Sequence, residues 1–94
     1  MRDVVIVDSV RTGLTKAFRG SFNLTRSDDM LAHCIDSLLD RNPNLSPEEV
    51  EDVVVGAATH AGEQDGNLAR LAVVLSKLPI TVAGVSINRF CSSG

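Results

Sequence analysis

The chain has 94 residues, of which 44% are hydrophobic and 22% are charged, and its net charge is −3. This composition is typical of a globular protein and argues against a disordered chain. Aromatic residues are scarce and basic residues are scattered, so the sequence offers neither base-stacking platforms nor a positive patch. We therefore expect no nucleic-acid partner, and the short apolar runs predict no membrane span.

The N-terminus and the cysteines bear on the cellular compartment. Met1 leads almost at once into an apolar run, without the charged and hydrophobic regions of a signal peptide. Cys34 and Cys91 are far apart and do not make a disulfide framework. The sequence therefore predicts a reducing, cytoplasmic location.

Apolar residues in the first half of the chain predict one strand and one helix. Val4–Val7 is a continuous β-branched run, typical of a strand that is buried on both faces. Residues 9–25 are rich in polar residues and glycine and predict a long loop. Apolar pairs then recur four residues apart from Ser27 to Arg41, which predicts a helix with one apolar stripe.

The second half repeats the alternation. Ser46–Glu49 has the pattern of a capping box with proline at the first position, which predicts a short helical turn. Asp52–Gly56 predicts a second strand, Leu68–Leu78 a second helix that Pro79 ends, and Ala83–Asn88 a third strand. This order predicts an α/β fold, a parallel-sheet βαβαβ unit with helices on both faces.

The residues after the third strand, Arg89–Gly94, resemble the entrance to a further helix because their small side chains permit close packing. No such helix follows within these 94 residues. We therefore expect the third strand to be covered on one face only, and residues 1–94 to be a partial domain that ends where this helix begins.

Cys91 is the residue best suited to chemistry. A thiol at a strand-to-helix turn faces free N–H groups and the positive end of the helix dipole, which stabilise the reactive thiolate. The turn exposes the thiol at the carboxyl edge of the sheet, and the Cys91 N–H lies near the place where an oxyanion develops. From spacing alone, a small buried residue in a tight turn stays open as the alternative.

Three stretches that together span nearly the whole chain carry a family resemblance: Val5–Gly13, Gly62–Ala72 and Val85–Gly94. The first resembles the opening strand and "VRT" loop of the thiolases, which comprise 3-ketoacyl-CoA thiolases and acetyl-CoA acetyltransferases. The second is similar to that family's "GE…N.AR.A" stretch. The third resembles its "VNR.C.SG" motif around the nucleophilic cysteine.

The resemblance implies a fold of two similar halves, of which this chain is most of one half, an N-terminal thiolase domain. It also implies acyl transfer between coenzyme A thioesters, as in the β-oxidation of fatty acids. The Cys91 thiolate attacks the 3-keto carbonyl of a 3-ketoacyl-CoA, acetyl-CoA leaves, and coenzyme A takes the acyl group from S-acyl Cys91.

The resemblance further implies partners and missing groups. Coenzyme A and acyl-CoA are substrates, with no permanently bound cofactor and no metal. The family also needs an activating His, a second Cys and an Asn or His at an oxyanion-hole water, and none of these matches a residue here. The implied partners are the remaining part of a thiolase chain and further subunits in a homodimer or homotetramer. We expect residues 1–94 alone to be inactive and poorly folded.

Other polar residues are weaker candidates. His60 follows the second strand, where a general base can lie, but it matches no catalytic motif, and His33 and Cys34 on the first helix are interpreted as structural. Asn67 and Arg70 open the second helix, which favours a structural or subunit-interface role over contact with the substrate. Three basic residues of the first loop are interpreted as solvated, with contact to coenzyme A phosphates as the alternative: Arg11, Lys16 and Arg19.

Four functions stay open from the sequence. A degradative 3-ketoacyl-CoA thiolase leads, because the "GEQ" and "NRFCSSG" wording is closest to that group. A biosynthetic acetyl-CoA acetyltransferase shares the chemistry, and an acyl-chain condensing enzyme shares the architecture and the position of the nucleophile. A non-catalytic α/β domain that binds a ligand is the fourth, and it predicts an ordinary thiol at Cys91.

Overall fold

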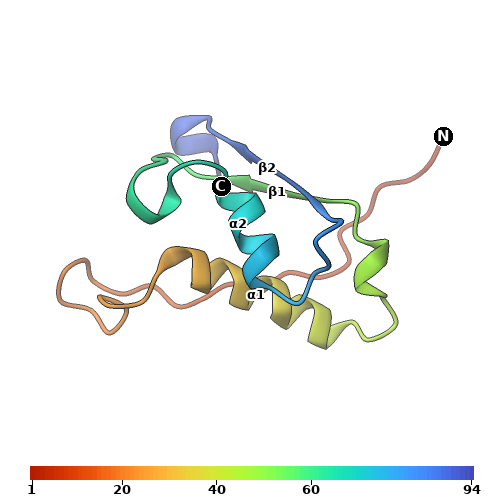
Figure 1. The fold of residues 1–94 in the computed structure, drawn as a ribbon, viewed down its shortest axis with the longest axis horizontal. Coiled ribbons are helices and arrows are strands. Elements are labelled where there is room, and N and C mark those ends of the chain that lie inside the picture. The colour runs from red at the N-terminus through yellow and green to blue at the C-terminus, as the bar shows by residue number, and fades with distance from the viewer.

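A computed structural model describes all residues from 1 to 94. Two helices and two strands alternate along the chain between residues 27 and 87 (Figure 1). The two strands pair in parallel, with Asp52 opposite Ala83 and Gly56 opposite Ile87. The α/β class predicted from the sequence is confirmed. The elements are α1 (Ser27–Arg41), β1 (Asp52–Gly56), α2 (Leu68–Leu75) and β2 (Ala83–Ile87).

The first helix has the predicted bounds. Two aspartates lie in the first turn of α1 and Arg41 in its last, so both ends complement the helix dipole. Asn42 ends the helix, and its backbone N–H donates to the Leu39 carbonyl. Next along the chain, residues 47–49 form a 3₁₀ turn as expected, but Ser46 makes no capping bond to the backbone, because its hydroxyl donates to Glu48 instead.

The second helix is the centre of the molecule. Figure 1 shows α2 between the sheet and α1, and its buried residues are small or branched. Gly84 permits this close approach, since a Cβ there would lie 2.8 Å from the backbone nitrogen of Arg70. The innermost apolar cluster is formed by Val73 of α2 with Leu78 and Val82, which lie between α2 and β2.

This helix ends earlier than predicted. The sequence pattern extends to Leu78, whereas α2 ends at Leu75. The Ser76 hydroxyl donates to the Val73 carbonyl and accepts from the Leu78 N–H, and the Lys77 N–H donates to the Asp36 carboxylate of α1. These side chains replace the next turn of helical hydrogen bonds.

The predicted first strand is not formed. The side chains of Val4–Val7 are between 73% and 96% exposed, and the sheet holds only β1 and β2. The segment is nevertheless attached just after this run, because the Asp8 carboxylate accepts from Arg41 at 2.9 Å and from the Asn42 side-chain amide at 3.0 Å. A β-branched run forms a strand only where it can pair with the edge of a sheet. In this segment the first hydrogen bonds to the rest of the fold are those of Asp8.

The prediction of helices on both faces of the sheet is wrong for these residues. Both helices lie on one side, in the order sheet, α2, α1 (Figure 1). The opposite face carries Val54, Val85 and Ile87, which are 61%, 41% and 42% exposed. The expectation that the last strand is covered on one face only is therefore confirmed. Neither helix is long and apolar enough to cross a membrane.

Candidate active site

Cys91 lies in a tight turn just beyond the carboxyl end of β2. The strand ends at Ile87, and residues Phe90–Ser92 form a single 3₁₀ turn in place of the longer helix entrance that the sequence suggested. Figure 1 shows this turn at the tip of the β2 arrow, beyond the end of β1 as well. The Cys91 thiol is free and its residue is exposed.

Hydrogen bonds within the turn fix its shape. The Ser92 N–H donates to the Arg89 carbonyl at 3.0 Å, and the Ser93 N–H donates to the Phe90 carbonyl at 3.1 Å. The Ser93 hydroxyl accepts from the Arg89 N–H and donates to the Phe90 carbonyl, each at 2.8 Å. None of these bonds uses the N–H of Cys91, so that donor takes no part in closing the turn.

The residue before the cysteine has a left-handed backbone. Phe90 has a φ of 50°, a region that bulky residues rarely adopt unless their surroundings hold them there. The Phe90 N–H donates to the side-chain oxygen of Asn88 at 2.7 Å. The amide nitrogen of Asn88 donates in turn to the Ala58 carbonyl at 3.1 Å, in the loop that follows β1. One side chain thus joins the turn to the neighbouring strand's loop.

The turn also rests directly on the end of β1. The Ala57 N–H donates to the Ile87 carbonyl at 3.1 Å, which extends the parallel pairing by one bond. At Gly56, a Cβ would lie 1.8 Å from the Ser93 carbonyl oxygen, so only the hydrogen of a glycine fits between the two backbones. The carboxyl ends of both strands therefore form the support of the Cys91 turn.

His60 is the histidine nearest to this edge. Its Nε2 lies 3.4 Å from the Ile87 carbonyl oxygen, and its ring is half-buried. The structure thus places the ring beside the last residue of β2, three residues before the turn that holds Cys91, and gives it no contact with the thiol. His60 remains a residue without an assigned catalytic partner.

Asn67 and Arg70 hold the second helix to the sheet. The Asn67 side-chain oxygen accepts from the Arg70 N–H at 3.2 Å and from the Ser86 hydroxyl at 2.8 Å, and its amide donates to the Gly84 carbonyl at 2.9 Å. The Arg70 guanidinium donates to the Ile80 and Val82 carbonyls, both at 2.9 Å. These contacts are structural, in line with the first of the two roles expected from the sequence.

The remaining candidates do not gather at the Cys91 turn. His33 is exposed and Cys34 half-buried, both on α1. The loop of residues 9–25, which contains the three basic candidates, runs beside α1 and away from the Cys91 turn (Figure 1). Only one of them lines a pocket: Arg11, in a hollow of about 470 Å³ that His33 also lines. No cluster of three His, Cys, Asp or Glu side chains is close enough to hold a metal ion.

Two carboxylates with displaced pKa values lie near the start of α1. Hydrogen bonds from the Arg26 guanidinium, at 2.9 and 3.0 Å, lower the pKa of the buried Asp28 carboxyl. The Ser27 backbone N–H, 2.6 Å from Glu63, lowers the pKa of that carboxyl. The Glu63 contact attaches the loop after β1 to the start of α1, and the Arg26–Asp28 pair is local to that start, so neither carboxylate lies at the Cys91 turn.

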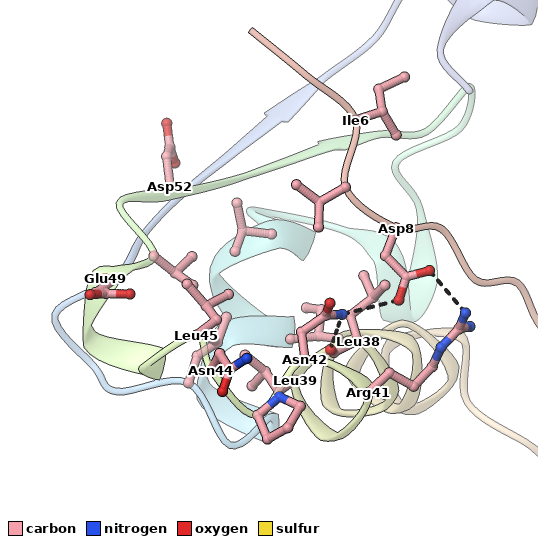
Figure 2. A pocket seen from close by; sticks show the side chains of 16 residues that line it. Ile6, Asp8, Leu38, Leu39, Arg41, Asn42, Asn44, Leu45, Glu49 and Asp52 are labelled. Atoms are coloured by element: carbon pink, nitrogen blue, oxygen red, sulfur yellow. Dashed lines mark hydrogen bonds and ion pairs between the residues drawn. The ribbon is translucent and has the colours of Figure 1, made fainter.

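The largest pocket is separate from the cysteine. It has a volume of about 790 Å³ and lies between the N-terminal segment, the end of α1 and the start of β1. Figure 2 shows Ile6 and Asp8 at its rim, with Leu38 and Leu39 of α1 below. None of its lining residues belongs to the Cys91 turn, so the pocket is no substrate site for this thiol.

A parallel sheet with helices packed on it, and a free thiol just past the carboxyl end of a strand, define an α/β domain with an exposed cysteine at the edge where such folds commonly bind ligands. Residues 4–94 match the model of the thiolase N-terminal domain. The chain therefore belongs to the thiolase family.

Several curated relatives have the same name. The chain is 44% identical over 93 residues to the 3-ketoacyl-CoA thiolase of Aeromonas salmonicida, and equally so to that of Aeromonas hydrophila. It is 41% identical to the 3-ketoacyl-CoA thiolase of Pseudoalteromonas atlantica. Each match covers 99% of this chain and 24% of the relative, so the chain spans about a quarter of their length.

Sequence reasoning identified Cys91 but missed the residues that hold its turn: Gly56, Asn88 and Ser93. A signal was present for Asn88, because asparagine side chains commonly bond to a backbone N–H two residues on and thereby begin a turn. No comparable signal marks Gly56, whose partner lies far along the chain.

Proposed function

We propose that this chain supplies the acyl-accepting cysteine of a 3-ketoacyl-CoA thiolase. The observation that carries the proposal is the placement of Cys91, exposed in a turn that two strand ends support, with its N–H outside the bonds that close the turn. The relatives that match nearly the whole chain, and that are named 3-ketoacyl-CoA thiolase, support the substrate class.

In the proposed reaction, the Cys91 thiolate attacks the 3-keto carbon of a 3-ketoacyl-CoA. The carbonyl oxygen becomes an oxyanion, and a backbone N–H at the turn is a donor of the kind that stabilises it. Collapse breaks the bond between carbons 2 and 3, the leaving carbanion takes a proton, and acetyl-CoA departs. The thiol of a free coenzyme A then attacks S-acyl Cys91, and the shortened acyl-CoA leaves as the cysteine is regenerated.

This chain contributes some of the required groups. It has the nucleophile and the backbone of its turn, whereas no residue here matches the family's activating His or second Cys. We therefore propose that those groups come from outside residues 1–94, and that the working enzyme is a homo-oligomer that takes acyl-CoA substrates in the cytoplasm. Coenzyme A takes part as a substrate and not as a resident cofactor.

The experiment is a chimera in which residues 4–94 replace the matching quarter of the Aeromonas salmonicida 3-ketoacyl-CoA thiolase. We expect thiolysis of 3-ketoacyl-CoA by the chimera, and a mass increase of one acetyl group on the Cys91 peptide after incubation with acetyl-CoA. The matched control is the same chimera with Cys91→Ser, which should lose turnover while Cys34 stays unmodified in both.

Two outcomes contradict the proposal. One is a chimera that matches the parent enzyme in circular dichroism and elution volume but catalyses no thiolysis. The other is turnover that persists in the Cys91→Ser chimera. Turnover restricted to acetoacetyl-CoA would instead favour an acetyl-CoA acetyltransferase.

A further inference from the structure

We infer that Asn88 is the positioning residue of Cys91: its side-chain amide holds the backbone of the turn from which the thiol projects. The inference rests on the proposed function of Cys91 as nucleophile. Asn88 itself touches no reacting atom in this arrangement, so it acts through the conformation of the turn.

The first step of the argument is the backbone of Phe90. Its φ of 50° sets the direction in which the chain continues to Cys91, the second residue of the 3₁₀ turn. The Phe90 side chain is 77% exposed, so packing of the ring does not hold this conformation. Hydrogen bonds on both sides of the residue do: the Phe90 carbonyl accepts from Ser93, and the Phe90 N–H donates to the Asn88 side-chain oxygen at 2.7 Å.

The second step is the other half of the same amide. The Asn88 nitrogen donates to the Ala58 carbonyl at 3.1 Å, across a separation of 30 residues. The group of Phe90 that meets the amide is its N–H and the group of Ala58 is its carbonyl, so the two contacts together require the amide in the observed orientation. Asparagine supplies an acceptor and a donor on one short side chain, whereas aspartate supplies only the acceptor and alanine supplies neither.

The third step is the link to chemistry. The Ser93 hydroxyl, which closes the turn on its far side, lies 3.4 Å from the same Asn88 oxygen. When that oxygen is removed, Phe90 is free to return to negative φ, and the Cys91 thiol and N–H move with it. A displacement of a reacting group by about 1 Å costs on the order of 100-fold in rate. Loss of the amide should therefore affect the rate of acylation more than the binding of the acyl-CoA.

The conformational test uses amide hydrogen exchange on the chimera described above. In Asn88→Ala we expect the Phe90 amide to exchange about fivefold faster, the loss that an ordinary net hydrogen bond predicts. The Leu71 amide, which bonds to the Asn67 carbonyl at the start of α2, serves as the internal reference and should not change. Asn88→Asp keeps the acceptor, so it should restore protection at Phe90, and Asn44→Ala in an exposed loop is the matched control.

The outcomes separate positioning from general stability. Unchanged exchange at Phe90 in Asn88→Ala overturns the inference. So does an equal acceleration at Phe90 and Leu71, because the substitution would then loosen the whole domain and not the turn. A failure of Asn88→Asp to restore any protection at Phe90 also overturns it, because the acceptor for the Phe90 N–H would then not be what holds the turn.

The kinetic test uses the chimera described above. With Asn88→Ala we expect kcat for thiolysis to fall by about 10- to 100-fold while KM for the acyl-CoA stays within about twofold. A rise in KM at constant kcat would overturn the positioning role. If Cys91 is never acetylated even with Asn88 present, the proposed function is wrong. The hydrogen-exchange result does not depend on that outcome and still tests whether Asn88 holds the turn.

Discussion

The contact between Gly56 and the Cys91 turn leads to the sharpest prediction, which concerns Gly56→Ala. In the present structure a Cβ at position 56 would lie 1.8 Å from the Ser93 carbonyl oxygen and 2.7 Å from its carbonyl carbon. Both atoms belong to the main chain, so no side-chain rotation relieves the overlap. Either the end of β1 or the turn itself has to move.

The size of the effect follows from that distance. An ordinary Cβ contact begins near 3.4 Å, so the Ser93 carbonyl must shift by about 1.6 Å, which exceeds the ~1 Å error that costs on the order of 100-fold in rate. β1 is paired to β2 along its whole length and the turn is exposed, so the turn should be the part that moves. We expect acylation of Cys91 to slow by about 100-fold, and the free energy of unfolding to fall by about 1 to 3 kcal/mol.

The assay measures acetylation of Cys91 in the chimera by mass spectrometry over time, together with urea denaturation of the same chimera. Gly13→Ala is the matched control, because a Cβ there would meet only the Phe22 ring, at 4.0 Å. The control should change neither quantity. An acylation rate within about twofold of the starting protein in Gly56→Ala would refute the reasoning, because the turn would then have absorbed the methyl group without moving the thiol.

Other substitutions probe the frame of the site. Asn67→Ala removes the cap of α2 and its bonds to β2, so urea denaturation should show a loss of about 1 to 2 kcal/mol, of which Asn67→Asp recovers part. Gly84→Ala places a methyl group 2.8 Å from the Arg70 nitrogen and should cost about 1 to 3 kcal/mol in the same measurement. The pKa of Asp28 is lowered by its bonds to Arg26, so the stability that it contributes is present above the unfolded-state pKa and is lost as pH falls through the folded one. The urea midpoint should therefore drop below about pH 4, and it should drop less in Asp28→Asn.

Local patterns in the sequence were sufficient for the elements that their own periodicity defines. The bounds of α1 and β1 match the prediction, because one is a repeat of apolar pairs with charges that suit both helix ends and the other is a compact β-branched run. The end of α2 was misplaced because the Ser76 hydroxyl and the Asp36 carboxylate take over the backbone donors and acceptors there. That exchange depends on α1 lying beside α2, which periodicity does not encode.

The N-terminal run marks the limit of such reasoning. Val4–Val7 has the composition of a buried strand, but the contacts of this segment come from Asp8, whose pKa is lowered by the Asn42 amide. Strand formation requires a free sheet edge at the right place, and composition specifies only that a residue suits one. The same applies to the bare face with Val54 and Val85, since a β-branched pattern indicates burial without indicating the covering element.

The same distinction between local patterns and contacts from distant segments applies to the candidate site. Cys91 was identifiable from its motif, because the motif is contiguous. The support of its turn was not, because it is made almost entirely through main-chain atoms: the Ser93 carbonyl against Gly56, and the Ala58 carbonyl against Asn88. Every residue type has a carbonyl, so nothing at Ala58 or Ser93 signals the contact. Only two positions carry a signal in the sequence, because there the main chain of another segment limits which side chain fits. Gly56 must have no side chain, and Asn88 must have a short amide. Substitutions at these two positions, rather than at the residues they touch, are therefore the ones that test how the thiol is held.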